Sequence, residues 1–180
     1  YDGGLRNIGE QLRISGVVPE SIVDGRGFRF TIFTQGCPHH CPGCHNPQTH
    51  DFSGGKLVDT DWLFQELKKD PLLKGVTFSG GEPFCQPGIL ARLAQRIHQE
   101  TKLDVTVYTG WTLEELWGMQ DPDIAALLNE TDVLIDGRYV EAERDLSLLF
   151  RGSRNQRVID MKASRAAGAP VLLQLDEPSA

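Results

Sequence analysis

The sequence has no long hydrophobic run and little positive charge. None of its segments approaches the roughly 18 consecutive apolar residues that a membrane-spanning helix requires. Lys and Arg number 18 against 25 Asp and Glu, which gives a formal net charge of −7. Phosphate backbones and anionic lipid surfaces repel such a chain. We therefore expect neither nucleic acid nor membrane as a partner.

The chain is also short and lacks internal repeats. Its 180 residues are too few for a complete eight-stranded α/β barrel, which takes about 250 residues. They are enough to bury a sizeable core without disulfides. The segment 1–11 lacks the basic-then-apolar layout of a signal peptide, which leads us to expect a cytoplasmic protein. We expect 1–11 to be a flexible N-terminal segment and 12–180 to form a single domain.

Cysteine is scarce, but three of the four cysteines lie within eight residues. Cys37, Cys41 and Cys44 form a Cys-x3-Cys-x2-Cys pattern in a loop of about 20 residues that is rich in His, Pro and Gly. In a reducing compartment such a cluster is typical of a metal or catalytic site rather than a disulfide. Soft thiolates select zinc, copper(I) or iron–sulfur clusters.

Two kinds of metal centre remain open from the cysteines alone. An iron–sulfur cubane held by three thiolates keeps one iron free for an outside ligand. A structural zinc ion instead needs a fourth ligand. The candidates for that ligand are His39, His40, His45 and His50.

Apolar and β-branched segments alternate with amphipathic ones along the chain. The pattern predicts strands at Leu12–Val18, Phe28–Thr34, Gly75–Ser79, Leu103–Tyr108, Val133–Asp136, Arg157–Met161 and Val171–Leu175. It predicts helices from Thr60 or Asp61 to Lys69 and at Pro87–Glu100, Thr112–Met119 and Asp123–Asn129. This alternation indicates an α/β fold with a mostly parallel sheet of about 5–6 strands and helices outside. Since the chain is too short to close a barrel, we expect a partial, open β/α barrel.

Four unusual loops follow four of these strands. The cysteine loop follows the strand that ends at Thr34, and Gly80-Gly81-Glu82-Pro83 follows the strand that ends at Ser79. The loop 108–111 and the pair Asp136-Gly137 follow two further strands. Ligands of parallel α/β folds bind at the C-terminal ends of the strands. The four loops therefore predict one shared site.

Two motifs together resemble a known superfamily. The segments FTQGCPHHCPGCHNP (33–47) and FSGGEP (78–83) are similar to the radical S-adenosylmethionine superfamily. More narrowly, the chain resembles the activating proteins of anaerobic ribonucleoside-triphosphate reductase from about residue 12 to 161. The stretches that carry this closer resemblance are RISGVVPESIVDGRGFRF (13–30), YTGWTLEEL (108–116), DVLIDGRYV (132–140) and LLFRGSRNQRVIDM (148–161).

The resemblance implies a [4Fe–4S] cluster on Cys37, Cys41 and Cys44, with S-adenosyl-L-methionine chelating the fourth iron. It implies an oxidoreductase that cleaves S-adenosylmethionine reductively and generates a glycyl radical on the reductase, its protein partner. The expected electron donor is a flavodoxin, a ferredoxin or a thioredoxin-like system. The cofactors carry the chemistry, so no general acid or base is nominated.

The resemblance also implies a set of cofactor-binding residues. Gly80 and Gly81 would let the backbone approach the methionine end, and Glu82 would meet its ammonium group. Two strand-end residues are candidates for ribose or methionine groups. The full set is Gly43, Cys44, His45, Gly80, Gly81, Glu82, Pro83, Thr109 and Asp136.

Other functions remain open at this point. One is an activase for another glycyl-radical enzyme or a radical enzyme for a small substrate. Another is a zinc-structured binding module, which gives no reason for the Gly-Gly-Glu-Pro motif. Cys85 is either a structural or a redox thiol. The basic stretch Arg151–Arg157 is either a solvated turn or a contact with the partner or cofactor.

Overall fold

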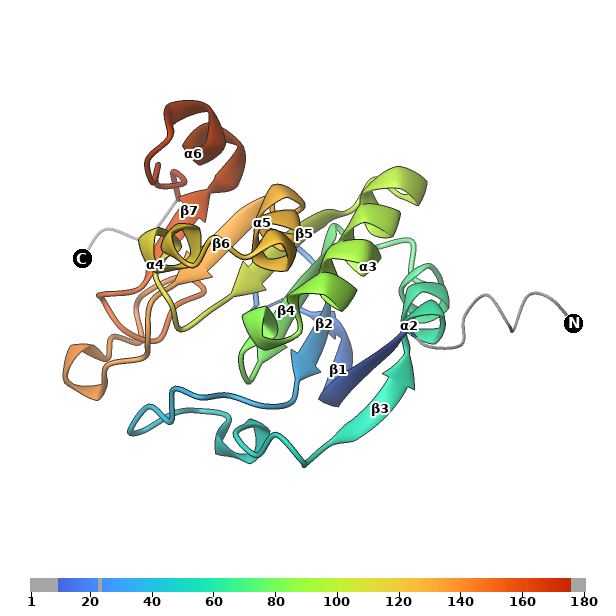
Figure 1. Ribbon diagram of the computed structural model, residues 1–180, viewed down its shortest axis with the longest axis horizontal. Coiled ribbons are helices and arrows are strands. Elements are labelled where there is room, and N and C mark those ends of the chain that lie inside the picture. The colour runs from blue at the N-terminus through green and yellow to red at the C-terminus, as the bar shows by residue number, and fades with distance from the viewer. Residues whose placement is uncertain (1–9, 23, 176–180) are drawn as a thin grey trace, which may run out of the picture.

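A computed structural model describes residues 10–22 and 24–175. Within these residues the chain forms one seven-stranded sheet in the order β3-β1-β2-β4-β5-β6-β7 (Figure 1). Strands β2, β4, β5 and β6 are parallel, whereas β1, β3 and β7 join antiparallel at the two edges. The strands are β1 (Gln11–Ser21), β2 (Arg29–Thr34), β3 (Lys56–Asp59), β4 (Gly75–Gly80), β5 (Asp104–Tyr108), β6 (Val133–Asp136) and β7 (Arg157–Asp160).

Side chains at the helix ends supply the caps. The Asp59 carboxylate accepts the Asp61 N–H at the start of α2, and Thr112 and Glu115 form a capping box on α4. Gly168, with φ of 69°, ends α6 in a left-handed conformation. The helices are α2 (Thr60–Leu67), α3 (Pro87–Glu100), α4 (Leu113–Gly118), α5 (Pro122–Asn129) and α6 (Met161–Ala167).

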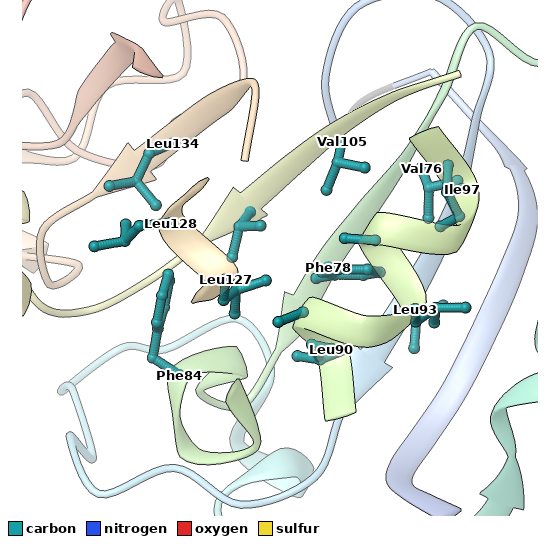
Figure 2. Packing of buried hydrophobic residues seen from close by; sticks show 14 of the residues in the cluster. Val76, Phe78, Phe84, Leu90, Leu93, Ile97, Val105, Leu127, Leu128 and Leu134 are labelled. Carbon is teal, nitrogen blue, oxygen red and sulfur yellow. The ribbon is translucent and has the colours of Figure 1, made fainter. Parts of the chain in front are cut away.

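The main core lies between the sheet and the helices α2, α3 and α5. Leu90, Leu93 and Ile97 of α3 lie against Val76 and Phe78 of β4 (Figure 2). Side chains alternate between the two faces of a strand. The residues of β4 between these core positions therefore point to the other face, which carries polar side chains and borders the site described below.

The structure confirms the α/β architecture with a parallel centre. The sheet has more than the expected 5–6 strands, because antiparallel strands extend it on both sides of the parallel centre. One of them, β3, does not correspond to any predicted strand. The predicted strand Val171–Leu175 is wrong, because it contributes a single bridge between Leu172 and Ile159. The strand predicted to reach Met161 ends at Asp160, whose carboxylate accepts the Ala163 N–H and starts α6.

Residues 1–9 of the expected flexible segment 1–11 lie outside the described residues. Gln11 already pairs with Asp59 at the start of β1. Among the residues that are described, no helix combines the length and the apolar character needed to cross a membrane.

An ionic cluster at the C-terminal part of α3 ties that helix to the segment before β6. His98 Nε2 lies 2.8 Å from Asp132 Oδ2, and His98 Nδ1 lies 3.4 Å from Glu130 Oε2. The hydrogen bond with Asp132 raises the pKa of His98 above its usual value of 6.5, against the opposing effect of burial. Burial raises the pKa of Asp132, but bonds from His98 and the Val105 N–H outweigh it and lower that pKa.

The raised pKa of His98 predicts a pH-dependent stability. Its contribution is fully present below 6.5 and is lost as pH rises through the folded-state pKa. We expect the free energy of unfolding, followed in urea, to fall as the pH rises from 6.5 through the folded-state pKa of His98. His98→Gln removes the titrating group and serves as the control. A parallel pH dependence in wild type and His98→Gln would contradict the prediction.

Candidate functional site

A cavity of about 520 Å³ lies where the parallel strands end. The loops after β2, β4, β5 and β6 all contribute to its lining, as their positions after parallel strands predict. In Figure 1 the loop after β2 extends beyond the arrowheads of the central strands. The candidate residues that line it are Cys37, Cys41, Cys44, His45, Gly80, Gly81 and Thr109. Gly43, Glu82, Pro83 and Asp136 are not among the lining residues.

The backbone of the cysteine loop is held by its own return segment. The Gly36 N–H donates to Thr49 O at 2.7 Å, and the Cys37 N–H donates to His50 O at 3.1 Å. Gly36 has φ of 106°, a left-handed conformation that favours glycine. The strand end therefore turns sharply into the loop, which places Cys37 at the cavity.

All four cysteines have free thiols. Cys37 is buried, and Cys41 and Cys44 are half-buried. Burial raises the pKa of the Cys37 and Cys41 thiols above the usual value of 9.0. Iron must displace the protons of these thiols when it binds, so ligation releases protons and becomes more favourable as pH rises.

Three soft thiol donors facing one cavity fit an iron–sulfur cluster with an open iron. In the described part of the chain, no three His, Cys, Asp or Glu side chains form a group that could hold a metal ion. A cluster instead spans the space between its cysteines, and the three thiols share the lining of one large cavity.

The glycine pair at the end of β4, Gly80 and Gly81, lies directly against the start of the cysteine loop. The Gly81 N–H donates to Thr34 O at 2.9 Å, and the Glu82 N–H donates to Gly36 O at 2.8 Å. A Cβ on Gly80 would lie 2.5 Å from Thr34 N, and one on Gly81 would collide with the Gly36 carbonyl oxygen. Only glycine therefore allows the two backbones to approach this closely.

Glu82 is buried and joins three loops. It is 1% exposed, and its Oε1 lies 2.7 Å from His39 Nε2 and accepts the Gly110 N–H, also at 2.7 Å. Its Oε2 accepts the Phe84 N–H at 3.1 Å. Protein donors thus already occupy much of the carboxylate that the resemblance assigns to an ammonium group.

Asp136 also bonds to protein groups. It accepts the Leu113 N–H at the start of α4, and Arg157 donates to both of its oxygens at 3.0 and 2.5 Å. Thr109 lines the cavity, and its hydroxyl accepts the Trp111 N–H at 3.1 Å. Of the two strand-end candidates, only Thr109 borders the cavity.

Two further candidates, His45 and Gly43, flank Cys44 within the cysteine loop. His45 lines the cavity and packs against Tyr139, with ring centroids 5.0 Å apart. Gly43 has φ of 76° and faces the Glu141 carboxylate.

Cys85 is exposed and does not belong to the lining; desolvation and the charge of Glu82 raise the pKa of its thiol to about 12.

Sequence reasoning missed the outer wall of the cavity. Segment 145–152 contributes five hydrophobic or charged side chains, together with Arg151, the first residue of the basic stretch expected to be either a solvated turn or a contact with the partner or cofactor. The Tyr108 hydroxyl donates to Phe150 O at 2.6 Å and anchors this segment to β5. Phe150 has φ of 64°, a strained value that no sequence signal reveals. The five are Asp145, Leu146, Leu148, Leu149 and Phe150.

The close approach at Gly81 predicts that it tolerates no side chain. Gly81→Ala should lower the free energy of unfolding by about 2–4 kcal/mol and loosen the cysteine loop, because the new Cβ collides with backbone that cannot move alone. Gly118→Ala is the matched control, since a Cβ there meets nothing within 4 Å. It should be neutral or stabilising by up to about 1 kcal/mol. Urea unfolding measures both, and equal effects would refute the prediction.

Comparison with known proteins identifies the family of this chain. Residues 23–159 match the family described as "4Fe-4S single cluster domain". The anaerobic ribonucleoside-triphosphate reductase-activating protein of Haemophilus influenzae is 39% identical over 146 residues, which cover 77% of this chain and 91% of that protein.

The protein of the same name from Escherichia coli K12 is 37% identical over 78% of this chain and 93% of its own. A pyruvate formate-lyase-activating enzyme from Clostridium pasteurianum is 32% identical over 79% of this chain, which spans 59% of that enzyme. The resemblance drawn from the sequence is confirmed. The chain belongs to the 4Fe-4S single cluster domain family and, within it, to the anaerobic ribonucleoside-triphosphate reductase-activating proteins.

Proposed function

We propose that this protein activates anaerobic ribonucleoside-triphosphate reductase by generating a glycyl radical on it. The observation that carries the proposal is the shared cavity of three free thiols and a glycine pair at the ends of adjacent parallel strands. Cys37, Cys41 and Cys44 would hold a [4Fe–4S] cluster, and the iron that no cysteine holds would be open to S-adenosylmethionine. The names of the relatives point to the same activity.

The cofactors and the protein divide the work. When bound, the cluster and S-adenosylmethionine supply the one-electron chemistry that removes a hydrogen atom from a glycine of the reductase. The protein binds and orients these groups. The backbone of Gly80 and Gly81 faces the cavity and would contact the methionine end, while His45 and Thr109 border the space for the rest of the cofactor.

Glu82 and Asp136 would act less directly. Both carboxylates are buried and bonded to protein donors, so they would hold the loop after β4 and the start of α4 in place. Gly43 and Pro83 would shape the backbone of their loops without contacting the cavity. The candidate site residues thus divide into those that would touch cofactor and those that would position others.

The sheet would form an open barrel whose missing side the reductase covers. Helices α2, α3 and α5 cover one face, and the other face borders the cavity. We keep 12–180 as a single domain built on this sheet.

The electron donor would be a flavodoxin, a ferredoxin or a thioredoxin-like system. A reducing cytoplasm would keep the cysteines available for iron.

A second candidate function is the activation of another glycyl-radical enzyme. The relative from Clostridium pasteurianum, named for pyruvate formate-lyase activation, supports it. This chain spans 59% of that enzyme but more than nine-tenths of the reductase-activating relatives, which favours the reductase.

The activity itself can be tested by electron paramagnetic resonance. We expect a glycyl radical when the reduced protein, S-adenosylmethionine and the reductase are mixed without oxygen. Substitution of the acceptor glycine of the reductase by alanine should abolish the signal. A radical on a formate-lyase partner but none on the reductase would support the second candidate. A colourless protein that binds zinc and never cleaves S-adenosylmethionine would exclude both.

The cysteine assignment predicts a sharp difference among the four thiols. Anaerobic reconstitution of wild type should give about four iron and four sulfide per chain. Alanine at Cys37, Cys41 or Cys44 should remove most of the iron and the broad visible absorption. Cys85→Ala is the matched control and should retain both, because Cys85 is outside the cavity lining. Full iron content in any of the first three variants would contradict the assignment.

A further inference from the structure

The four loops at the cavity are joined by one chain of hydrogen bonds. Arg138, in the loop after β6, donates from Nε to His39 Nδ1 at 3.1 Å. His39, in the cysteine loop, lies 2.7 Å from Glu82 through Nε2. Glu82, after β4, accepts the N–H of Gly110, after β5. The chain therefore contains one residue from each loop.

The hydrogen-bond partners of the His39 ring determine which of its nitrogens carries the proton. A guanidinium offers only donors, so Nδ1 of His39 must accept from Arg138. The ring proton then lies on Nε2, where it donates to the Glu82 carboxylate. The Glu82 carboxylate accepts only, so it calls for the same proton on Nε2. Loss of Arg138 would leave Nδ1 without its donor and remove the bond that orients the ring from the β6 side.

Packing holds the ring where the hydrogen bonds require it. The His39 side chain is 5% exposed, and its ring lies edge-on to Trp111 with centroids 4.7 Å apart. A Cβ on Gly110 would lie 2.6 Å from His39 Nε2, so the loop after β5 lies directly on the ring. The ring cannot leave this position without moving the cysteine loop or the Gly110 loop.

We propose that His39 is a positioning residue that sets the cysteine loop in register with the Gly-Gly-Glu-Pro loop, and that Arg138 holds the His39 ring in the orientation that does so. This inference rests on the proposed function. The consequence of losing His39 is specific. Cys37, Cys41 and Cys44 would still hold the cluster, but the cluster and the Gly80–Gly81 backbone would no longer be aligned for one S-adenosylmethionine molecule. His39 thus governs cofactor affinity rather than cluster content.

Substitution of His39 in the reconstituted holoenzyme tests this role. His39→Leu should keep about four iron per chain while its dissociation constant for S-adenosylmethionine rises about tenfold. The change that S-adenosylmethionine causes in the electron paramagnetic resonance spectrum of the reduced cluster should then need correspondingly more cofactor. His39→Gln keeps an N–H that can reach Glu82 and should restore the affinity to within about threefold of wild type.

Arg138→Met supplies the second arm of the test. It should raise the same dissociation constant about threefold, and the double variant with His39→Leu should be no worse than His39→Leu alone, because the two residues act in one chain. Arg144 is exposed and takes no part in these hydrogen bonds, so Arg144→Met is the control for lost charge. His40→Asn is the control for a lost histidine beside the cysteines. His40 has a positive φ of 48°, a conformation that asparagine tolerates.

Several outcomes would overturn the inference. They are wild-type affinity in His39→Leu, equal losses in His39→Leu and His39→Gln, and loss of iron in step with loss of cofactor. Additive effects of His39→Leu and Arg138→Met would also overturn it. If His39→Leu does not fold, Arg138→Met and His39→Gln still decide. Failure of the wild-type protein to bind S-adenosylmethionine at all would instead refute the proposed function.

Discussion

The cavity depends on a buried negative charge. The Glu82 carboxylate is 1% exposed, and a charge so far from water is tolerated only when several donors surround it. Two of those donors, His39 and Gly110, lie on segments far from Glu82 in the sequence, and the third is the Phe84 N–H of its own loop. The loops are therefore not independent: displacing any of them leaves the carboxylate short of a partner, and the free-energy cost resists the displacement.

A buried positive charge occupies the opposite end of the parallel strands. The Arg29 side chain at the start of β2 is fully buried, donates to Thr77 Oγ1 and Val76 O of β4, and pairs with Asp104 of β5. One ionic centre thus ties β2, β4 and β5 together where they begin, and Glu82 ties their loops together where they end. Between the two, the apolar core on the helix side holds the sheet.

Sequence patterns predicted the parts of the fold that rest on local chemistry. The β-branched runs, the amphipathic helices and the order of the parallel strands place four loops on one edge, and the cysteine spacing indicates what one loop binds. The edge β3 is not predicted because Lys56–Asp59 has only four residues, two of them charged, and is defined by pairing with β1 rather than by its own pattern. Strand Val171–Leu175 was predicted from propensity alone, although only one bridge forms there.

Individual roles were harder to predict because they depend on which way a side chain points. Asp136 ends β6 and Glu82 lies two residues beyond β4, positions from which the sequence predicts contact with a ligand, yet each carboxylate accepts backbone N–H groups of a neighbouring loop or helix start. A buried carboxylate is stabilised by backbone N–H groups that have no other partner. The sequence does not show which N–H groups lie close to which carboxylate. Of the candidate residues, the glycine backbone, the three thiols, His45 and Thr109 therefore border the cavity, while the two carboxylates hold the loops that place them there.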